Sequence, residues 1–365
     1  MTSSDFWRGK RVLLTGHTGF KGAWTALWLE QLGADVTGFA LTPPDDRDCI
    51  FSCVKPWPKL TSVIGDLRDP AAIARAVKAS DPQIVIHMAA QALVRRSYSD
   101  PVETFGSNVM GTVNLLAALM DRTALRTILV VTSDKVYDND NAGRAFREDD
   151  RLAGDDPYSA SKAATELVAR SWRKSFLRSS DSPALGVARA GNVIGGGDWG
   201  EDRLVPDVIR AGMKGSAVAL RYPDATRPWQ HVLDVIAGYL AYAERLTEKP
   251  GHAPPALNFG PSARAPQLKA REIAEKLQQN FGWAHGWVLQ DGAPLPEKTL
   301  LSLDPSLAFE TLGWRPKLSA SDALQWTARW HRAHMQGEDM RKMSMSDIAE
   351  FAGLPARSDK SLAAE

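Results

Sequence analysis

The sequence holds two short groups of residues that could form an acid–base site: Ser133, Asp134 and Lys135, then Tyr158 and Lys162. The first group follows directly on a run of apolar residues, and the second lies in a segment with helical periodicity. Residues four apart lie on one face of a helix, so the tyrosine and the second lysine can act together. Hydroxyl groups beside an amine are suited to taking a proton from a substrate hydroxyl, and the neighbouring acid and base allow a further proton transfer.

Tyr158 needs help to act as a base, because a free tyrosine has a pKa near ~10. We expect the ammonium of Lys162, together with a cationic cofactor ring, to stabilise the phenolate and lower that pKa. Ser133, at the end of a predicted strand, is placed to hydrogen-bond the same substrate hydroxyl. A tyrosine and a lysine at this spacing are also common on solvated helices, so the interpretation depends on the serine and on a cofactor loop upstream.

The stretch TGHTGFKG, residues 15–22, has the features of such a cofactor loop. Its glycines lie between a predicted strand and a predicted helix. Small residues let the backbone approach a diphosphate, and the helix N-terminus offers free N–H groups and a favourable dipole. We therefore expect a dinucleotide to be held by Gly16, His17, Thr18, Gly19, Phe20 and Gly22.

The choice between NAD and NADP depends on the end of the second predicted strand, where an acid usually binds the ribose of NAD. The sequence there is GFALTPP, with neither an acid nor an arginine. We favour NAD, and expect Lys21 to face solvent or the phosphates. Asp66 and Leu67, after the third predicted strand, could lie beside the adenine or could only form a helix-starting turn.

Short apolar runs alternate with helical patterns through the first half of the chain. Such alternation predicts βαβ units and an α/β fold with a Rossmann-type, doubly wound parallel sheet. We expect residues 1–190 to form the dinucleotide-binding domain, 191–350 a smaller C-terminal substrate-binding lobe and 351–365 a peripheral tail. The predicted strands are 11–15, 35–40, 62–65, 84–89, 127–132 and 185–190, and the predicted helices are 20–33, 70–79, 104–120 and 158–176.

The composition narrows the class of protein. The 365 residues carry a net charge of +1 without a charge block, which gives no indication of nucleic-acid or membrane binding. Cys49 and Cys53 form no disulfide framework, and without nearby His or Cys partners they make a poor metal site, so we expect no metal. We find no signal peptide and no apolar stretch of about 18 residues, which predicts a cytoplasmic protein.

These features resemble the short-chain dehydrogenase/reductase family, in its extended branch of nucleotide-sugar epimerases and dehydratases. Further motifs bring the chain nearest to the CDP-glucose 4,6-dehydratases of that family, and the similarity extends to about residue 330. The motifs are HMAAQALVRRSYSDP (87–101), NVMGT (108–112), GNVIGGGDW (191–199) and RPWQHV (227–232). The resemblance implies NAD as the cofactor, held also by Ala89, Ala90, Gln91, Tyr158 and Lys162.

The resemblance also implies a lyase reaction, in which the 4-hydroxyl of a sugar is oxidised, water is lost across C5 and C6, and the hydride returns to C6. Asp134 matches the family acid, and Lys135 stands where dTDP-glucose dehydratases have glutamate. Lys135 must lose its charge to act as a base, which burial beside other cations favours. An Asp-Lys pair can also be an ordinary solvated turn.

Further expectations concern the substrate and the assembly. Arg203 and Arg227 are suited to the diphosphate of a nucleotide sugar, Asn192 is implied by resemblance, and Trp199 is as well explained by packing as by ligand contact. His17 could crowd the cofactor diphosphate and weaken its retention.

By resemblance, we expect a homodimer or homotetramer formed through the helices 104–120 and 158–176. The apolar residues expected in this interface are Val109, Leu116, Ala164, Leu167 and Trp172.

Two other functions fit parts of the sequence. A sugar-nucleotide 4-epimerase would share the loop and Tyr158 but would not need Asp134 and Lys135 as an acid and a base. A non-catalytic dinucleotide sensor would not need the Tyr158–Lys162 pair that this chain retains.

Overall fold

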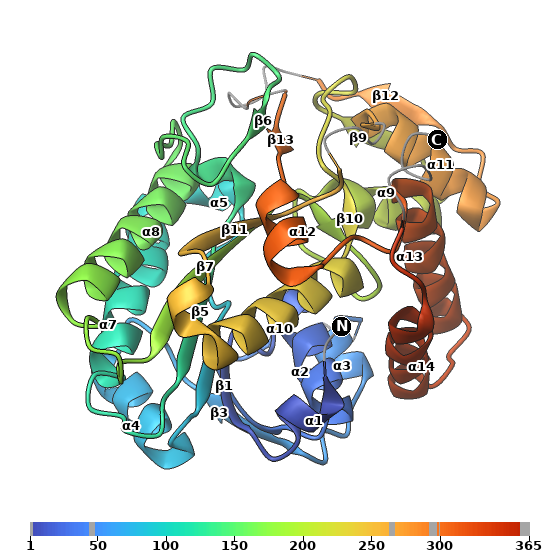
Figure 1. Ribbon diagram of the computed structural model, residues 1–365. Coiled ribbons are helices and arrows are strands. Elements are labelled where there is room, and N and C mark those ends of the chain that lie inside the picture. The colour runs from blue at the N-terminus through green and yellow to red at the C-terminus, as the bar shows by residue number, and fades with distance from the viewer. Residues whose placement is uncertain (1–2, 44–47, 263–266, 292–297, 299, 358–365) are drawn as a thin grey trace.

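The fold centres on a parallel sheet of seven strands in the order β11-β7-β5-β4-β1-β2-β3 (Figure 1). The computed structural model describes residues 3–43, 48–262, 267–291, 298 and 300–357. The strands are β1 Arg11–Thr15, β2 Asp35–Ala40, β3 Leu60–Ile64, β4 Ile84–His87, β5 Thr127–Val131, β7 Ala184–Ala190 and β11 Ala256–Phe259. The Rossmann-type, doubly wound parallel sheet predicted from the sequence is confirmed, and β11 adds a strand to the six predicted.

Helices cover both faces of this sheet, as the continuous apolar strands require. One face packs on α1 (Ser4–Trp7), α2 (Phe20–Gln31) and α10 (Val232–Glu248), and the other on α4 (Pro70–Ser80), α7 (Gly111–Ala118) and α8 (Pro157–Ser175). Figure 1 shows α4, α7 and α8 on the left, with α2 and α10 across the sheet from them. The two faces therefore hold separate apolar cores on either side of one sheet.

The predicted helix 104–120 is interrupted in the structure. It consists of α6 (Pro101–Phe105), a π-helical turn η1 (Gly106–Met110) and α7. The wider turn contains Asn108, whose carbonyl oxygen accepts hydrogen bonds from the side chains of Thr112 and Thr165 at 2.7 and 2.9 Å. Such bonds from outside the regular ladder stabilise a π turn, and these turns occur often at functional sites.

The C-terminal part contains an apolar core of its own. Its central elements are α9 (Leu204–Met213), β9 (Val218–Leu220), α11 (Ala270–Phe281), β12 (Trp287–Leu289) and α13 (Ala320–Met335). The remaining elements are α3 Ile50–Cys53, α5 Val94–Ser99, η2 Asp134–Val136, β6 Ala145–Phe146, β8 Val193–Ile194, β10 Gln230–His231, η3 Pro250–His252, β13 Ser302–Leu303, α12 Ser306–Leu312 and α14 Met340–Gly353. Two later segments return to the first domain: α10 packs on one face of the sheet, and β11 joins its edge.

The segment predicted to be a peripheral tail begins inside a packed helix. Phe351, the first residue of that segment, is buried near the end of α14, and its ring lies 5.7 Å from that of Trp28. Lys317 Nζ donates hydrogen bonds to the carbonyl oxygens of Phe351 and Ala352. The core therefore extends past residue 350, because α14 covers α2, and residues 358–365 lie outside the described part.

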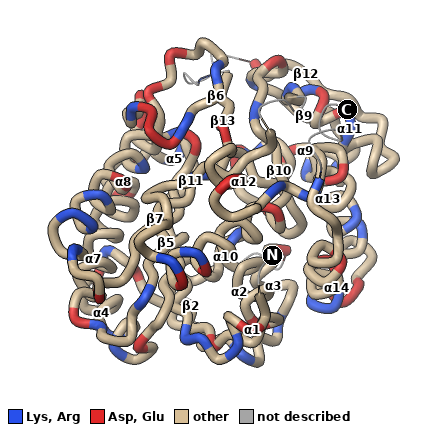
Figure 2. Tube along the Cα trace, in the orientation of Figure 1, with Lys and Arg blue, Asp and Glu red and all other residues tan. Residues whose placement is uncertain are grey.

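The strand order reverses between β1 and β4, since the chain moves from β1 toward β3 and then from β4 toward β11. Ligands of doubly wound sheets bind at this point, beyond the carboxyl ends of the strands. Charges of both signs are spread over the surface in Figure 2. In the described ranges, every helix is too short or too polar to span a membrane.

Candidate active site

A cavity of about 1010 Å³ opens beyond the carboxyl ends of β1, β4 and β5. Most of the residues predicted to bind cofactor or substrate lie on its wall. They are Gly16, Thr18, Gly19, Phe20, Gly22, Asp66, Leu67, Ala89, Ala90, Gln91, Ser133, Asp134, Lys135, Tyr158, Asn192, Trp199, Arg203 and Arg227. Two predicted residues, His17 and Lys162, are not on the wall that the described residues form.

The glycine loop forms a cradle that only small residues permit. Gly16 has a φ of +80°, and a Cβ added there would lie 2.8 Å from the backbone nitrogen of Ala89. A Cβ on Gly22 would lie 2.0 Å from the carbonyl oxygen of Gly16. The helix α2 begins just after Gly19, and no side chain of the described residues caps it. Its first N–H groups are therefore available to an anion in the cavity.

His17 does not crowd this cradle, contrary to the prediction. Its side chain is buried beneath β2, where the ring lies against Gly38 and donates to or accepts from Ser62 Oγ at 2.7 Å. The ring of Phe51 packs edge-on at 5.4 Å. Burial lowers the pKa of His17 to about 4, so the ring is neutral. The absence of a side chain at Gly38 makes room for the ring, and the neighbours of a loop residue could not be read from the loop alone.

Asp66 and Leu67 lie where the cavity passes the end of β3. The Asp66 carboxylate is paired with Arg68, which donates hydrogen bonds from Nε and Nη2 and holds the pKa of the carboxyl below its usual range. Thr18 Oγ1 donates to the carbonyl oxygen of Leu41, which joins the glycine loop to the segment after β2. These contacts fix the cavity wall beside the glycine loop.

The loop after β4 is held in place by Asn108, which the sequence analysis did not assign to the site. Asn108 Oδ1 accepts from the backbone N–H of Gln91 at 2.8 Å, and its Nδ2 donates to Ser161 Oγ at 2.8 Å. Ser161 Oγ in turn donates to the carbonyl oxygen of Tyr158. A signal was present, because the asparagine lies between Gly106 and Gly111 in an otherwise helical segment.

Ser133, Asp134 and Lys135 follow β5, and the last two begin the short helix η2. Ser133 Oγ accepts from the backbone N–H of Lys135 and donates to Asp134 Oδ1 at 2.9 Å. Burial raises the pKa of Asp134 above its usual range, although the nearby Lys135 and the bond from Ser133 oppose this. The other oxygen, Oδ2, has no hydrogen-bond partner within the described ranges. Asp134 is therefore suited to carrying a proton.

Tyr158 and Lys162 lie in the first two turns of α8, which starts at Pro157 after the N-cap Asp156. Burial raises the pKa of Tyr158 to about 12, and a hydrogen bond with Ser133 opposes the rise. The pKa of Lys162 is lowered to about 7 by burial and then by the charge of Lys21. In the protein alone, burial of the phenol outweighs the interactions that lower its pKa. The predicted lowering of the Tyr158 pKa includes the charge of the cofactor ring and stays a prediction.

The four predicted substrate contacts lie on the lobe side of the cavity. Arg203 Nη1 lies 2.9 Å from both carboxylate oxygens of Asp198, whose side chain is buried. Arg227 donates to the carbonyl oxygens of Thr226 and Lys298. The ring of Trp199 packs against His331 at 5.2 Å while also lining the cavity. Trp199 therefore both packs and faces the ligand space.

Residues 12–258 match the model of the NAD dependent epimerase/dehydratase family. The chain belongs to this family.

Other members of the NAD dependent epimerase/dehydratase family are similar over most of their length. The CDP-glucose 4,6-dehydratase of Salmonella typhimurium is 42% identical over 98% of this chain and 100% of that protein. The dTDP-glucose 4,6-dehydratase of Streptomyces griseus is 30% identical over 88% of this chain and 94% of that protein.

A solved dTDP-glucose 4,6-dehydratase from Streptomyces venezuelae, with NAD bound, superposes with a TM-score of 0.77. It is 26% identical and covers 90% of this chain and 99% of its own. NAD is also the cofactor of the present chain, as a member of this family. The cradle at Gly16 and Gly22 and the open N-terminus of α2 fit its diphosphate.

Proposed function

We propose that this chain is a lyase that converts CDP-glucose into CDP-4-dehydro-6-deoxyglucose and water. The observation that carries the proposal is the position of Asp134 and Lys135, which share a cavity wall with Ser133 and Tyr158 at the end of β5. Alcohol oxidation alone would need only the hydroxyl groups and Lys162, whereas elimination of water needs an acid and a base in addition. The identity of 42% with a CDP-glucose 4,6-dehydratase over the whole chain supports the same reaction.

In the first step Tyr158 takes the proton of the sugar 4-hydroxyl, and Ser133 hydrogen-bonds the same oxygen. NAD, held in the cradle at Gly16 and Gly22, would supply the hydride acceptor and donor for C4 and C6, and its positive charge would favour the ionised form of Tyr158. Lys162, one helical turn further along α8, contributes positive charge on the same side. The 4-ketone that forms makes the neighbouring C5–H acidic.

In the second step Lys135 removes the C5 proton, while Asp134 gives a proton to the departing 6-hydroxyl. The C6–O bond breaks, a C5–C6 double bond forms and water leaves. When C6 receives the hydride, Lys135 returns its proton to C5, and the proton held by Tyr158 restores Asp134. Every proton is accounted for, and the unpaired oxygen of buried Asp134 supports its role as the acid.

The proposed substrate contacts lie on the side of the cavity that the C-terminal lobe forms. Arg227 and Arg203 carry positive charge toward the diphosphate, Asn192 lies in the segment after β7, and Trp199 offers an aromatic face.

The reaction requires no membrane or nucleic acid, and a location in the cytoplasm is our prediction for this enzyme.

The test is to offer the chain CDP-, dTDP-, GDP- and UDP-glucose with NAD and to follow the alkaline chromophore of a 4-keto sugar. We expect the chromophore with CDP-glucose first among the four. Formation of a CDP-linked C4 epimer without loss of water would support a 4-epimerase instead, and binding of NAD without turnover would support a sensor.

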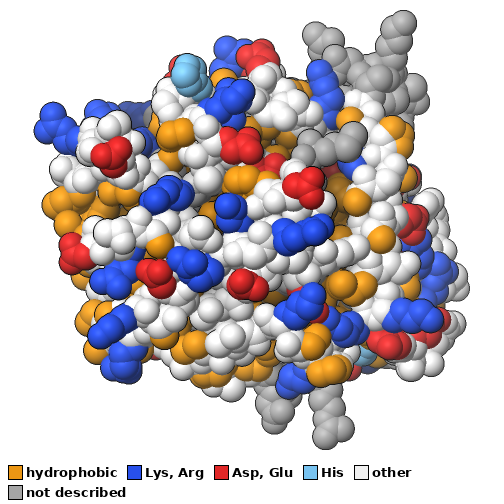
Figure 3. Space-filling model, turned by 60° about the horizontal axis from the view of Figure 1, so that its bottom comes forward, with side chains coloured by type: hydrophobic (Ala, Val, Ile, Leu, Met, Phe, Trp, Pro, Cys, Tyr) orange, Lys and Arg blue, Asp and Glu red, His pale blue; other side chains and the backbone are white. Residues whose placement is uncertain are grey.

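We also propose a homodimer formed through α6, η1 and α8. Val102, Met110 and Leu167 are large apolar side chains that are 81%, 52% and 54% exposed. Hydrophobic side chains gather along the left margin of Figure 3, the side on which Figure 1 places α7 and α8. Leu116 does not belong to this surface, contrary to the prediction, because its side chain points from α7 into the buried apolar core.

A further inference from the structure

Three segments that are distant in sequence meet at one carboxylate on the wall of the active-site cavity. Asp202 Oδ1 accepts a hydrogen bond from Arg95 Nη1 at 2.9 Å and another from Arg221 Nη1 at 3.1 Å. Arg221 Nη2 also donates to the carbonyl oxygen of Asp202 at 2.8 Å. Arg95 comes from α5, Asp202 from the loop before α9, and Arg221 directly follows β9. All three residues line the cavity.

This arrangement places two guanidinium groups around one oxygen atom, which is the way arginines bind a phosphate. The side chains of Arg95, Asp202 and Arg221 are 37%, 40% and 22% exposed, so a solute in the cavity can reach them. Ion pairs at such exposure contribute little stability. A diphosphate, which carries two negative charges against the one charge of a carboxylate, can therefore replace Asp202.

The other arginines of this wall are less available. Arg203 has both oxygens of the buried Asp198 carboxylate within hydrogen-bond distance, and Arg227 is fixed by two backbone carbonyl groups. Breaking the Arg203–Asp198 pair would leave a buried carboxylate without its counter-charge, which is costly. Release of Asp202 leaves a carboxylate that solvent can reach.

We propose that Arg95 and Arg221 bind the diphosphate of the nucleotide sugar, with the Asp202 carboxylate holding the two side chains together until the substrate displaces it. The inference rests on the proposed function and adds two positioning residues to it. The backbone of Asp202 has a φ of +58°, a left-handed conformation that is uncommon outside glycine, asparagine and aspartate. The loop thus directs a short acidic side chain toward the two arginines.

The cofactor also carries a diphosphate, but a different part of the cavity is suited to it. That group belongs to the glycine loop and the N-terminus of α2, which Figure 1 places in the lower half of the molecule, with α5 and β9 near the top. Arg221 belongs to the lobe that also carries Trp199 and Arg203. We therefore assign Arg95 and Arg221 to the substrate rather than to NAD.

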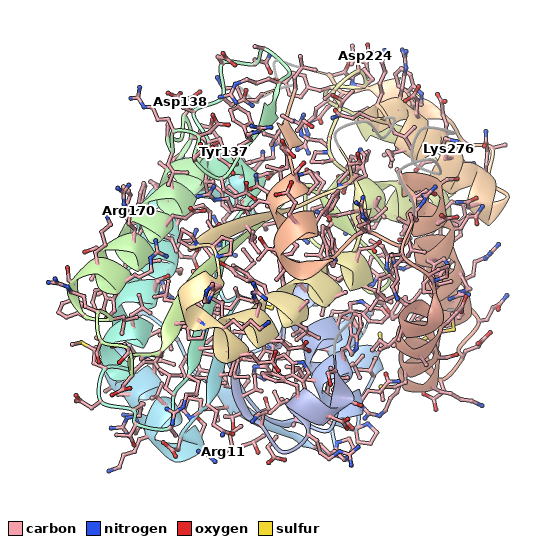
Figure 4. All side chains as sticks on the ribbon, in the orientation of Figure 1. Arg11, Tyr137, Asp138, Arg170, Asp224 and Lys276 are labelled. Carbon is pink, nitrogen blue, oxygen red and sulfur yellow. The ribbon has the colours of Figure 1, made fainter. Side chains whose placement is uncertain are left out.

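The test uses the full-length variants Arg95→Gln and Arg221→Gln, with Arg11→Gln as the control. Arg11 forms an exposed pair with Asp81 and lies at the bottom of Figure 4, whereas Asp224, just after Arg221 in sequence, lies at the top. The control removes the same charge from an exposed ion pair outside the cavity.

We expect each cavity variant to weaken binding of CDP by about 10- to 100-fold, the loss that follows removal of a charge-assisted hydrogen bond. KM for CDP-glucose should rise by the same factor with kcat nearly unchanged, because the contact is made in both ground and transition state. Binding of cytidine, which has no phosphate, and of NAD should not change. The Arg11→Gln protein should match the wild type throughout.

Asp202→Asn tests the displacement, since asparagine tolerates the left-handed backbone and removes only the charge. KM for CDP-glucose should fall by about 2- to 5-fold, the range of an exposed ion pair. CDP bound equally well by wild type and both cavity variants would overturn the proposal, and a rise of KM in Asp202→Asn would overturn the displacement. A loss of NAD affinity instead would assign the pair to the cofactor. If wild-type protein failed to convert CDP-glucose at all, the proposed function would fail, whatever the binding of CDP showed.

Discussion

Ser133 donates a hydrogen bond to one oxygen of Asp134, at 2.9 Å, and thereby fixes the orientation of the carboxyl group. The second oxygen, Oδ2, is buried and has no partner among the residues that the structure describes. Burial raises the pKa of Asp134, which favours the protonated form. Asp134 lines the cavity together with Ser133, which places this carboxyl group at the reaction space.

Asp134→Asn should lower kcat by about 10²- to 10⁴-fold, the usual contribution of a general acid. Asparagine preserves the shape and the bond from Ser133 but cannot release a proton to the departing hydroxyl. In deuterated water, this variant should still exchange the C5 hydrogen of the substrate, since Lys135 is intact. Mass spectrometry of recovered CDP-glucose measures that exchange, and full activity of the variant would contradict the assignment.

Lys135→Ala should also stop the loss of water, but for a different reason. Without the amine no group removes the C5 proton, so we expect C4 oxidation to continue while deuterium no longer enters C5. A fall in kcat of about 10²- to 10⁴-fold is expected. As a control, binding of CDP and of NAD by the Lys135→Ala protein should be unchanged. Elimination at the wild-type rate would show that another residue is the base.

A buried ion pair holds α8 to the sheet. Arg189 on β7 donates to both carboxylate oxygens of Glu166 on α8, and both side chains are only 4% exposed. Arg189 Nη1 also donates to Tyr137 Oη at 2.7 Å, and Figure 4 shows Tyr137 near the upper end of α8. The Arg189–Glu166 pair lies between β7 and α8 and positions α8 on the sheet.

Arg189→Met should lower the free energy of unfolding by about 3–5 kcal/mol, because it leaves the Glu166 charge buried and uncompensated. Adding Glu166→Leu should restore much of this loss, since an apolar pair has no charge to desolvate. Urea denaturation measures both. Arg11→Met, which breaks an exposed pair, should cost about 1 kcal/mol or less. An equal loss in the single and double variants would contradict the account.

Leu167→Asp should convert the proposed dimer into monomers, because it places a charge in an apolar interface. Arg170 on the same helix projects from the left side of the molecule in Figure 4, which shows where this face of α8 points. Met213→Asp is the control, as Met213 is 53% exposed on α9. Sedimentation velocity measures the mass. A dimer that withstands Leu167→Asp but not Met213→Asp would place the interface elsewhere.

The strands were largely predictable from sequence because each one is a short, continuous apolar run between turn residues. β1 and β2 have the predicted bounds, and β4 and β5 end two residues and one residue earlier than predicted. The strand β11 was missed because ALNF is only four residues long and follows a proline-rich loop. The π turn at Gly106–Met110 was missed as well, since its stability comes from Thr165 on another helix.

For the site, the sequence could not predict the contacts between distant segments. The order of Ser133, Asp134 and Lys135 after an apolar run indicated chemistry at a strand end. The direction of the His17 ring could not be foreseen, because it depends on the empty space at Gly38. The meeting of Arg95, Asp202 and Arg221 depends on tertiary folding and leaves no local pattern in the sequence.

The most direct test of the central claim is the fate of a deuterium label on C4 of CDP-glucose. If one cavity takes the hydride and returns it, the label should appear on C6 of the same product molecule. A mixture of labelled and unlabelled substrate should give no exchange between molecules. Absence of the label from C6, or stoichiometric accumulation of reduced cofactor with turnover, would contradict the account.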